Sequence, residues 1–464
     1  MEAAKRLERQ QKELARLKKQ QAKPKGKFYI AYLFLILAII YIVDEVATNS
    51  ASELEDLLIK VFFPGDSASV ASSNFSIIST VALVLMILSC FYKPLADRFG
   101  RKPFLVLNTF GIAAAMAVCS LAVHAQSFVL YALGFVMMKW FVTPDEQVVY
   151  IFETAPKNYR ATVYSLIKGL AEFGLFLIPW FRSAFHVEEA PEHIRNVFFT
   201  IAICGAVIAF ASLFFARETD AYLNQRIAYL ELPEEEKEAF RKKKMRNTKQ
   251  QGGLIHALAA SFTNRQLLFI MVATTLYTLA RAVTEKHAAI LAIETFPTDF
   301  ITQAQFILPV GAGILTILYG LFSDKIGRKI TVIVMLALCT VFFGAFVLSF
   351  KLTQNPYLVG CFIGLYLAAY WGAGDTFIMM AGESAPTNLR ASVLSVHSLF
   401  YGMGQVISGV IVSIGLRFIG ESNTWLFLLI MAVPCFLGSI FVMMFLTNET
   451  HGADIESLPE QEKK

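Results

Sequence analysis

Ten charged side chains stand inside long apolar stretches of the chain, where a charge costs free energy unless it is paired or solvated. They are Asp44, Glu45, Lys139, Asp145, Glu146, Lys168, Glu172, Arg281, Glu285 and Asp375. At the centre of a bilayer each would cost about 2.5–3.5 kcal/mol, so ten unpaired, lipid-facing charges would cost on the order of 25 kcal/mol. These side chains must therefore pair with one another or face a wet cavity, where they can hold protons or a polar solute.

Lys139 stands near the middle of its apolar stretch, about midway between Gln126 and Glu153, and no acidic residue lies four positions away. We expect it to bind an anionic group of a solute. Arg281 is the second candidate for this role. The rings of Trp140, Tyr370 and Trp371 lie at similar depth and can flank a flat organic ligand or a cation; packing is the alternative. The predicted substrate-binding residues are Lys139, Trp140, Arg281, Tyr370 and Trp371.

Two pairs of opposite charge have helical spacing. Glu172 follows Lys168, and Glu285 follows Arg281, each by four residues, so each pair shares one helix face. Such a pair is either a permanently neutral structural pair or part of a functional site, and the sequence leaves both readings open.

The composition excludes the water-soluble classes. Of the 464 residues, 56% are hydrophobic and only 17% are charged, against a usual charged share of about 25%. A soluble enzyme could not bury that much apolar surface, and a disordered chain would not contain it. The six cysteines form no Cys-x-x-Cys or Cys/His cluster, and no nucleotide-binding loop or catalytic triad is visible. We therefore expect no metal, no cofactor, no nucleic-acid partner and no enzymatic activity.

The apolar stretches are the elements that position these charges, because a helix of about 20 apolar residues spans a bilayer. The sequence predicts an all-α membrane protein with twelve such spans. Their ranges are 28–50, 70–92, 103–122, 127–152, 161–181, 196–216, 266–292, 304–323, 329–350, 356–381, 391–416 and 424–446. The polar segment 217–263 divides them into six and six. The predicted domains are a basic arm (1–27), a first bundle (28–216), a linker with a surface helix (217–263), a second bundle (264–447) and a tail (448–464).

Basic residues mark one side of the predicted membrane. Residues 1–27 hold ten basic and three acidic residues, and the loops after spans 2, 4, 6 and 8 are also basic. The remaining loops are short or acidic. By the positive-inside rule the basic side is the cytoplasm, so both termini are expected there, in a multi-pass protein of the plasma membrane. The arm can also contact anionic lipids.

Two loop motifs each occur twice, and the copies of both are separated by nearly the same length of chain. Residues 95–102 read Leu-Ala-Asp-Arg-Phe-Gly-Arg-Lys, and residues 320–329 read Gly-Leu-Phe-Ser-Asp-Lys-Ile-Gly-Arg-Lys, with Asp97 and Asp324 as the motif aspartates. The second motif, Glu-x-x-Pro-x-x-x-Arg, begins at Glu153 and again at Glu383. Such a repeat indicates duplicated halves, which is typical of transporters.

These motifs resemble those of the major facilitator superfamily, in which the loop after span 2 reads Gly-x-x-x-Asp-Arg/Lys-x-Gly-Arg-Arg/Lys. Residues 320–329 match fully, whereas the first copy has Lys93 in place of the first Gly. The Glu-x-x-Pro-x-x-x-Arg motif resembles that of sugar porters, organic-ion carriers and metabolite–proton symporters. The resemblance covers the whole chain and implies two six-helix bundles that expose a midplane site to either side in turn. An arginine in span 4 and a glutamine-rich segment in span 7, both typical of sugar porters, are missing.

The resemblance implies that the loop motifs form a gate. In the superfamily the motif aspartates pair with basic residues and helix N-termini, and they hold the halves together when the outside is open. Arg101 and Arg328 can pair with the carboxylates of Glu153 and Glu383. The alternative is that these charges only set topology. The predicted gating residues are Asp97, Arg101, Glu153, Arg160, Asp324, Arg328, Glu383 and Arg390.

Four carboxylates are predicted to couple transport to protons. Asp44 and Glu45 come first, because the resemblance implies this role for a carboxylate in span 1. Glu172 lies centrally in span 5. Asp375 stands at the place in the second half that Asp145 has in the first, which favours either structural helix pairing or matched gating.

Three functions remain open. The leading hypothesis is proton-coupled uptake of a small organic solute, a carboxylate or a zwitterion, by a monomer. The alternatives are a proton-coupled exporter of organic or drug-like compounds and a facilitator for a sugar or another neutral solute. A non-transporting sensor that uses the arm and linker is a further class, against which the duplicated motifs argue.

Overall fold

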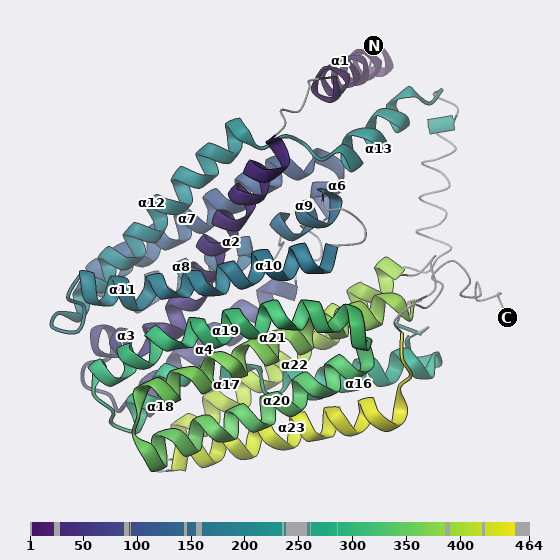
Figure 1. Ribbon diagram of the computed structural model, residues 1–464. Coiled ribbons are helices and arrows are strands. Elements are labelled where there is room, and N and C mark those ends of the chain that lie inside the picture. The colour runs from purple at the N-terminus through teal and green to yellow at the C-terminus, as the bar shows by residue number, and fades with distance from the viewer. Residues whose placement is uncertain are drawn as a thin grey trace.

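The computed structural model is almost entirely helical (Figure 1). The residues that it describes are 2–22, 28–87, 92, 94–142, 146–154, 160–233, 236–237, 258–259, 261–284, 286–385, 390–419 and 423–450. For a few residues within these ranges only the backbone is described.

Ten helices in the described ranges are long and apolar enough to cross a membrane. One of them is built from α10 (Arg160–Phe173), η2 (Gly174–Phe176) and α11 (Leu177–Ala184). The other nine are α2 (Tyr29–Glu53), α4 (Ala68–Ile87), α7 (Arg101–His124), α12 (Ile194–Phe215), α19 (Thr298–Ile326), α20 (Arg328–Leu348), α21 (Pro356–Glu383), α22 (Arg390–Phe418) and α23 (Thr424–Leu446).

The other two predicted spans consist of shorter pieces. Span 4 is described as α8 (Phe128–Val142) and α9 (Glu146–Thr154), with residues 143–145 outside the described ranges. Span 7 is α16 (Arg265–Thr278), α17 (Arg281–Thr284) and α18 (His287–Ile293). The predicted span over 266–292 is therefore interrupted and is not one continuous helix. Residues 279–280 form a turn, and Lys286 leaves helical geometry at φ −110° and ψ 6°, immediately before α18 begins.

The helices pack into two groups that meet along two seams. In the N-terminal group, α7 packs against α8 and α12, and α2 packs against α10 and α12. In the C-terminal group, α21 packs against α19 and α20, and α23 packs against α16 and α20. Between the groups, α10 lies along α19 and α4 lies along α22 (Figure 1).

A close helix contact in the C-terminal group depends on glycine. A Cβ atom added at Gly360 would lie 1.9 Å from the carbonyl oxygen of Ala304, and one at Gly364 would lie 2.0 Å from that of Leu308. Small residues four apart on α21 therefore allow its backbone to approach that of α19, as is common between membrane helices.

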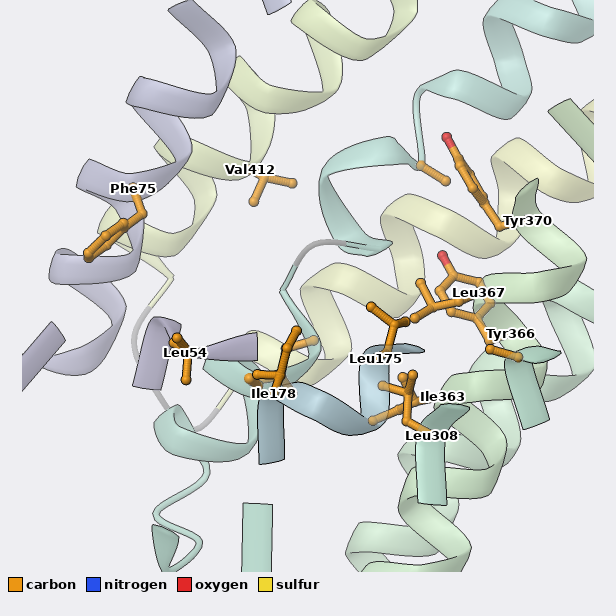
Figure 2. Close-up of a cluster of buried hydrophobic side chains, with 14 of the residues drawn as sticks. Leu54, Phe75, Leu175, Ile178, Leu308, Ile363, Tyr366, Leu367, Tyr370 and Val412 are labelled. Carbon is orange, nitrogen blue, oxygen red and sulfur yellow. The ribbon is translucent and has the colours of Figure 1, made fainter. Parts of the chain in front are cut away.

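A single apolar cluster continues across both groups, and Figure 2 shows part of it. Leu54, Phe75, Leu175 and Ile178 come from the N-terminal group, whereas Leu308, Ile363, Tyr366, Leu367, Tyr370 and Val412 come from the C-terminal group. The outer surface is also apolar, with Val129 at 80% and Phe445 at 66% exposure. Large apolar side chains on the outside of an apolar core are expected of helices that face lipid.

Two further helices pair beside the N-terminal group. Leu17 of α1 (Glu2–Gln21) packs against α13 (Asp220–Glu231), and Nε of Arg226 donates to Oε1 of Glu13 at 2.8 Å. The predicted surface helix of the linker is thus confirmed as α13.

The two ends of the molecule differ (Figure 1). We call the end with α1, α6 (Pro94–Phe99) and α13 the motif end, because the repeated loops lie there. We call the end with α3 (Glu55–Phe62), α11 and α18 the far end.

Candidate functional site

Buried charges of the two groups pair at the far end. Nζ of Lys286 donates to both carboxylate oxygens of Glu55, at 2.7 and 2.9 Å, and both side chains are only 4% exposed. Nζ also reaches the carbonyl oxygen of Ser72 at 3.3 Å, and Oγ of Ser72 donates to Glu55 at 2.6 Å. Glu55 begins α3, where a carboxylate is favoured by the helix dipole. This ion pair links α3 to the start of α18.

His287 and Arg182 add two more ionic contacts at the same end. Nε2 of His287 lies 2.8 Å from Oε1 of Glu53, and its Nδ1 lies 3.2 Å from the carbonyl oxygen of Thr284. Arg182 is completely buried and donates to both carboxylate oxygens of Asp56, at 3.1 and 2.9 Å. The planar guanidinium suits this two-fold contact with a carboxylate.

Gln305 of α19 joins these contacts across the groups. Its Oε1 accepts a hydrogen bond from Nη1 of Arg182 at 2.9 Å, and its Nε2 donates to the carbonyl oxygen of Glu53 at 2.5 Å. Nearby, Nζ of Lys60 donates to Thr298 at 3.0 Å. We call the residues Glu53, Glu55, Asp56, Arg182, Lys286, His287 and Gln305 the far-end network. It ties the two groups together at the far end.

A small cavity of about 20 Å³ lies beside this network, with room for roughly one water molecule. Lys139 lines it, and its Nζ lies 5.4 Å from the ring centroid of Phe135. The structure thus brings Lys139 to the same cavity as the Glu55–Lys286 pair. The polar side chains of its wall are those of Thr48, Ser52, Glu55, Ser79, Tyr131, Lys139 and Lys286.

Three of the candidates for substrate binding lie together: the ring centroids of Tyr370 and Trp371 are 5.6 Å apart, and Arg281 interacts electrostatically with Tyr370. The guanidinium of Arg281 lies 4.7 Å from the ring centroid of Trp371 and donates to Oγ1 of Thr284 at 2.7 Å, so the structure brings these two candidates together. Tyr370 is fully buried with its ring 4.4 Å from that of Tyr277. The roles of these residues in binding stay predictions.

The fifth candidate for substrate binding, Trp140, is half-buried and packs against Tyr92 with ring centroids 5.7 Å apart. It does not line the cavity of Lys139.

A second ion pair between the two groups lies away from the far end, between α10 and α21. Nζ of Lys168 donates to Oδ2 of Asp375 on α21 at 2.7 Å. The ammonium therefore pairs across the groups and not with Glu172, the partner that helical spacing suggested. Glu172 is 4% exposed, and within the described ranges no hydrogen bond or ion pair reaches its carboxylate. Its electrostatic neighbours are Glu45, Lys168 and Asp375.

The two adjacent acids of α2 have different contacts. Asp44 is buried and accepts a hydrogen bond from Nε2 of Gln147 on α9 at 2.7 Å. Glu45 is half-buried and accepts one from Nδ2 of Asn49 at 3.0 Å. Their part in proton coupling stays a prediction. Among the described side chains, no three from His, Cys, Asp or Glu come close enough together to hold a metal ion.

At the motif end, the expected arginine–glutamate pairs form inside each group. Nε of Arg101 lies 3.2 Å from Oε1 of Glu153, and Nε of Arg328 lies 3.3 Å from Oε1 of Glu383. Their gating role stays a prediction. Asp97, Arg160, Asp324 and Arg390 lie on described backbone, but their side chains are outside the described part. Asp145 and Glu285 lie outside it altogether.

A carboxylate and a hydroxyl that the sequence motifs did not indicate complete each pair. The carboxylate of Glu218 accepts backbone hydrogen bonds from Arg101 at 3.0 Å and Lys102 at 3.2 Å, and Oγ1 of Thr219 donates to Glu153. Burial raises the pKa of Glu218, although the backbone donors oppose that shift. An anion at the N-terminus of α7 is favourable.

The C-terminal group repeats this arrangement. Glu449 accepts backbone hydrogen bonds from Arg328 at 2.8 Å and Lys329 at 3.1 Å, and Oγ1 of Thr450 donates to Glu383 at 2.7 Å. A Glu-Thr dipeptide follows both span 6 and span 12, and its two copies are about as far apart in the chain as those of the other repeats. That matching separation is the signal that would have found them.

The far-end network was also missed as a unit. Its acids Glu53, Glu55 and Asp56 read as an ordinary polar loop, and its bases Lys286 and His287 fall inside a predicted span. The sequence signal was a charged stretch, residues 281–287, in the second half of an otherwise apolar span 7.

A family model described as "Sugar (and other) transporter" matches residues 30–461. No curated protein sequence gives a significant match. Among solved structures, the chain is similar to the inward-open xylose transporter XylE from E. coli (19% identity, 92% of this chain and 98% of that chain covered, TM-score 0.64). It is also similar to a D-xylose–proton symporter (16%, 92% and 99%, 0.63).

A third similar structure is an inward-facing bacterial homologue of the human lysosomal transporter Spinster (14% identity, 91% of this chain and 98% of that chain covered, TM-score 0.64). These likenesses confirm the predicted helical transporter fold. The family match extends over most of the chain. The chain belongs to the family of sugar (and other) transporters in the major facilitator superfamily, and it is a multi-pass membrane transporter, not an enzyme.

Proposed function

We propose that this transporter carries a sugar or a similar polar solute without net charge. The observation that carries the proposal is the pairing of buried charges. Lys168 pairs with Asp375, and Lys286 pairs with Glu55, so neither base offers its whole charge to an anionic solute. The wall of the cavity at Lys139 also carries hydroxyl groups, from Thr48, Ser52, Ser79 and Tyr131. Hydroxyl groups both donate and accept, which suits a polyhydroxylated solute once movement of the groups widens this water-sized cavity.

The comparisons support the same proposal. The family is described as one of sugar transporters, and two of the similar structures are of a xylose transporter and a D-xylose–proton symporter. The expected carboxylate or zwitterion has weaker support. It remains the second candidate because Lys139 and Lys286 both line the cavity, so two ammonium groups share it with the carboxylate of Glu55.

The proposal includes coupling, direction and movement. The solute enters the cell with protons, as in the similar D-xylose–proton symporter. The motif end faces the cytoplasm, because the basic loops lie there, and the protein lies in the plasma membrane as a monomer. Residues 28–216 and 264–447 rock against each other around a midplane site, joined by 217–263. The far-end network then closes the outer side, and the arginine–glutamate pairs belong to the inner gate.

Uptake into proteoliposomes tests this function. Labelled D-xylose, D-glucose and lactate are offered under an inward proton gradient, with and without a protonophore. We expect gradient-dependent accumulation of a sugar in the wild type and in the surface variant Glu192→Gln. Lactate accumulation that is lost in Lys139→Ala would favour the second candidate. Equilibration without accumulation would indicate a facilitator, and accumulation only under a reversed gradient would indicate an exporter.

A further inference from the structure

One buried acid of the membrane interior has no partner in the proposed mechanism. Glu172 is 4% exposed, and within the described ranges its carboxylate makes no hydrogen bond or ion pair. The neighbouring acids differ in this respect. Asp375 is paired with Lys168, and Asp44 is hydrogen-bonded to Gln147. A buried carboxylate without such a contact is disfavoured in its charged form, because nothing replaces the water it has lost.

The charges around Glu172 do not balance. Its electrostatic neighbours Glu45 and Asp375 are also acidic, and Lys168 is the basic one among its neighbours in the described part of the chain. Three carboxylates around one ammonium leave an excess of two negative charges if all are ionised. Like charges at close range favour protonation of at least one of them. Among the described residues, the phenols of Tyr164, Tyr319 and Tyr401 also interact with Lys168, and Arg281 interacts with Tyr401.

The depth of these groups fits a proton path. At 1.5 Å per residue, Glu172 lies about 18 Å from the motif end of α10, and Lys168 lies about 12 Å from it. Asp375 lies about 12 Å from the motif end of α21, level with Lys168. The inter-group ion pair thus lies between Glu172 and the motif end.

We propose that Glu172 binds the transported proton and that Lys168 exchanges its partner when this proton leaves. The inference rests on the proton coupling of the proposed function. With Glu172 protonated and neutral, Lys168 holds Asp375 across the groups. When the O–H bond of Glu172 breaks, the proton passes to water at the motif end and the electron pair stays on the carboxylate. This anion lies four residues from Lys168 on the same helix face and competes for its ammonium.

This exchange links proton release to movement of the groups. The ion pair between α10 and α21 weakens when its ammonium turns toward Glu172, so the groups can separate along that seam. In the reverse direction, protonation of Glu172 returns the ammonium to Asp375 and draws the groups together.

The first experiment needs no solute. Infrared spectroscopy of the protein in lipid membranes follows the carbonyl stretch of protonated carboxyl groups as the pH rises. We expect a band that disappears on titration in the wild type and in Glu192→Gln, a surface acid. It is absent in Glu172→Gln and returns with a shifted midpoint in Glu172→Asp. A spectrum of Glu172→Gln identical to that of the wild type would overturn the proposal.

The second experiment uses labelled D-xylose. We expect Glu172→Gln to lose accumulation under a proton gradient but to keep part of its solute exchange, at a rate that no longer depends on pH. Retained exchange shows that the variant folds. Accumulation equal to that of the wild type would overturn the proposal. If the wild type moves no sugar but the infrared band is present and depends on Glu172, the sugar function fails and the proton site stands.

Discussion

Removal of the Lys286 ammonium should open the far end. In Lys286→Met the carboxylate of Glu55 would remain buried without the ammonium that pairs with it, while Oγ of Ser72 would still donate to it at 2.6 Å. Loss of one partner from a buried ion pair costs about 3–5 kcal/mol. The cost falls on the closed far end alone, because an open far end returns Glu55 to water. At about 1.4 kcal/mol per factor of ten, the ratio of open to closed molecules rises about 100-fold or more.

Labelling of a new cysteine measures this shift. Ser79 lines the cavity beside the network, so Ser79→Cys in proteoliposomes reports access from the far end to a membrane-impermeant maleimide. We expect faster labelling in Lys286→Met, by up to the factor by which the ratio of open to closed molecules rises. The matched control is Lys351→Met. Lys351 pairs with Glu294 at 2.5 Å but is 36% exposed, and surface pairs contribute about 0–1 kcal/mol.

The double variant Glu55→Lys with Lys286→Glu provides the second control. It reverses both charges and should return labelling toward the wild-type rate, because the pair is restored with its direction exchanged. Unchanged labelling in Lys286→Met, or acceleration of the same size in Lys351→Met, would refute the role of this pair in closing the far end.

Three further predictions concern packing, pH and the motif end. Gly364→Ala should lower the melting temperature in detergent, because the added Cβ would meet the carbonyl oxygen of Leu308 and such overpacking costs about 1–3 kcal/mol. The control Gly344→Ala should not lower it, because a Cβ added there has no atom within 4 Å. Burial, together with a hydrogen bond shared with Asp299, raises the pKa of Glu188 at the far end. Glu188 therefore favours closure of the far end fully at pH below the ordinary range of glutamate, and this contribution weakens as the pH rises through the raised pKa. Labelling of Ser79→Cys should accelerate over the same pH range, and Glu188→Gln should abolish this pH dependence. Glu218→Ala leaves the backbone donors of Arg101 and Lys102 without their carboxylate, which should cost about 1–3 kcal/mol and lower the melting temperature, whereas Glu192→Ala should leave it unchanged.

Hydropathy was sufficient to predict the membrane-spanning helices, and the repeated motifs indicated their division into two halves. Helices that span a bilayer need about 20 apolar residues, and that length is visible in a sequence. The breaks in span 7, at residues 279–280 and at Lys286, were not visible in its hydropathy. Pairs in repeated motifs could be predicted, since Arg101 with Glu153 and Arg328 with Glu383 occur twice.

The ion pairs between the two helix groups could not be predicted from the sequence. The helical spacing of Lys168 and Glu172 is local and readable, but the contact that forms is with Asp375, 207 residues away. For the same reason the far-end network was read as separate loop charges. The buried partners of a charge are decided by which helices pack together, and no local pattern encodes that.

The far-end network also bears on the ancestry of the chain. The N-terminal group supplies the acids Glu53 and Glu55, and the C-terminal group supplies the bases Lys286 and His287. Two identical halves related by a two-fold axis would make every such contact twice, because residue i meets residue j and j meets i. Within the described residues the acid–base contacts between the halves at the far end occur once, with the acids on one half and the bases on the other, unlike those of an ancestor made of two identical halves. The motif-end pairs, each complete within one half, are compatible with such an ancestor, so the charges at the far end record divergence after duplication.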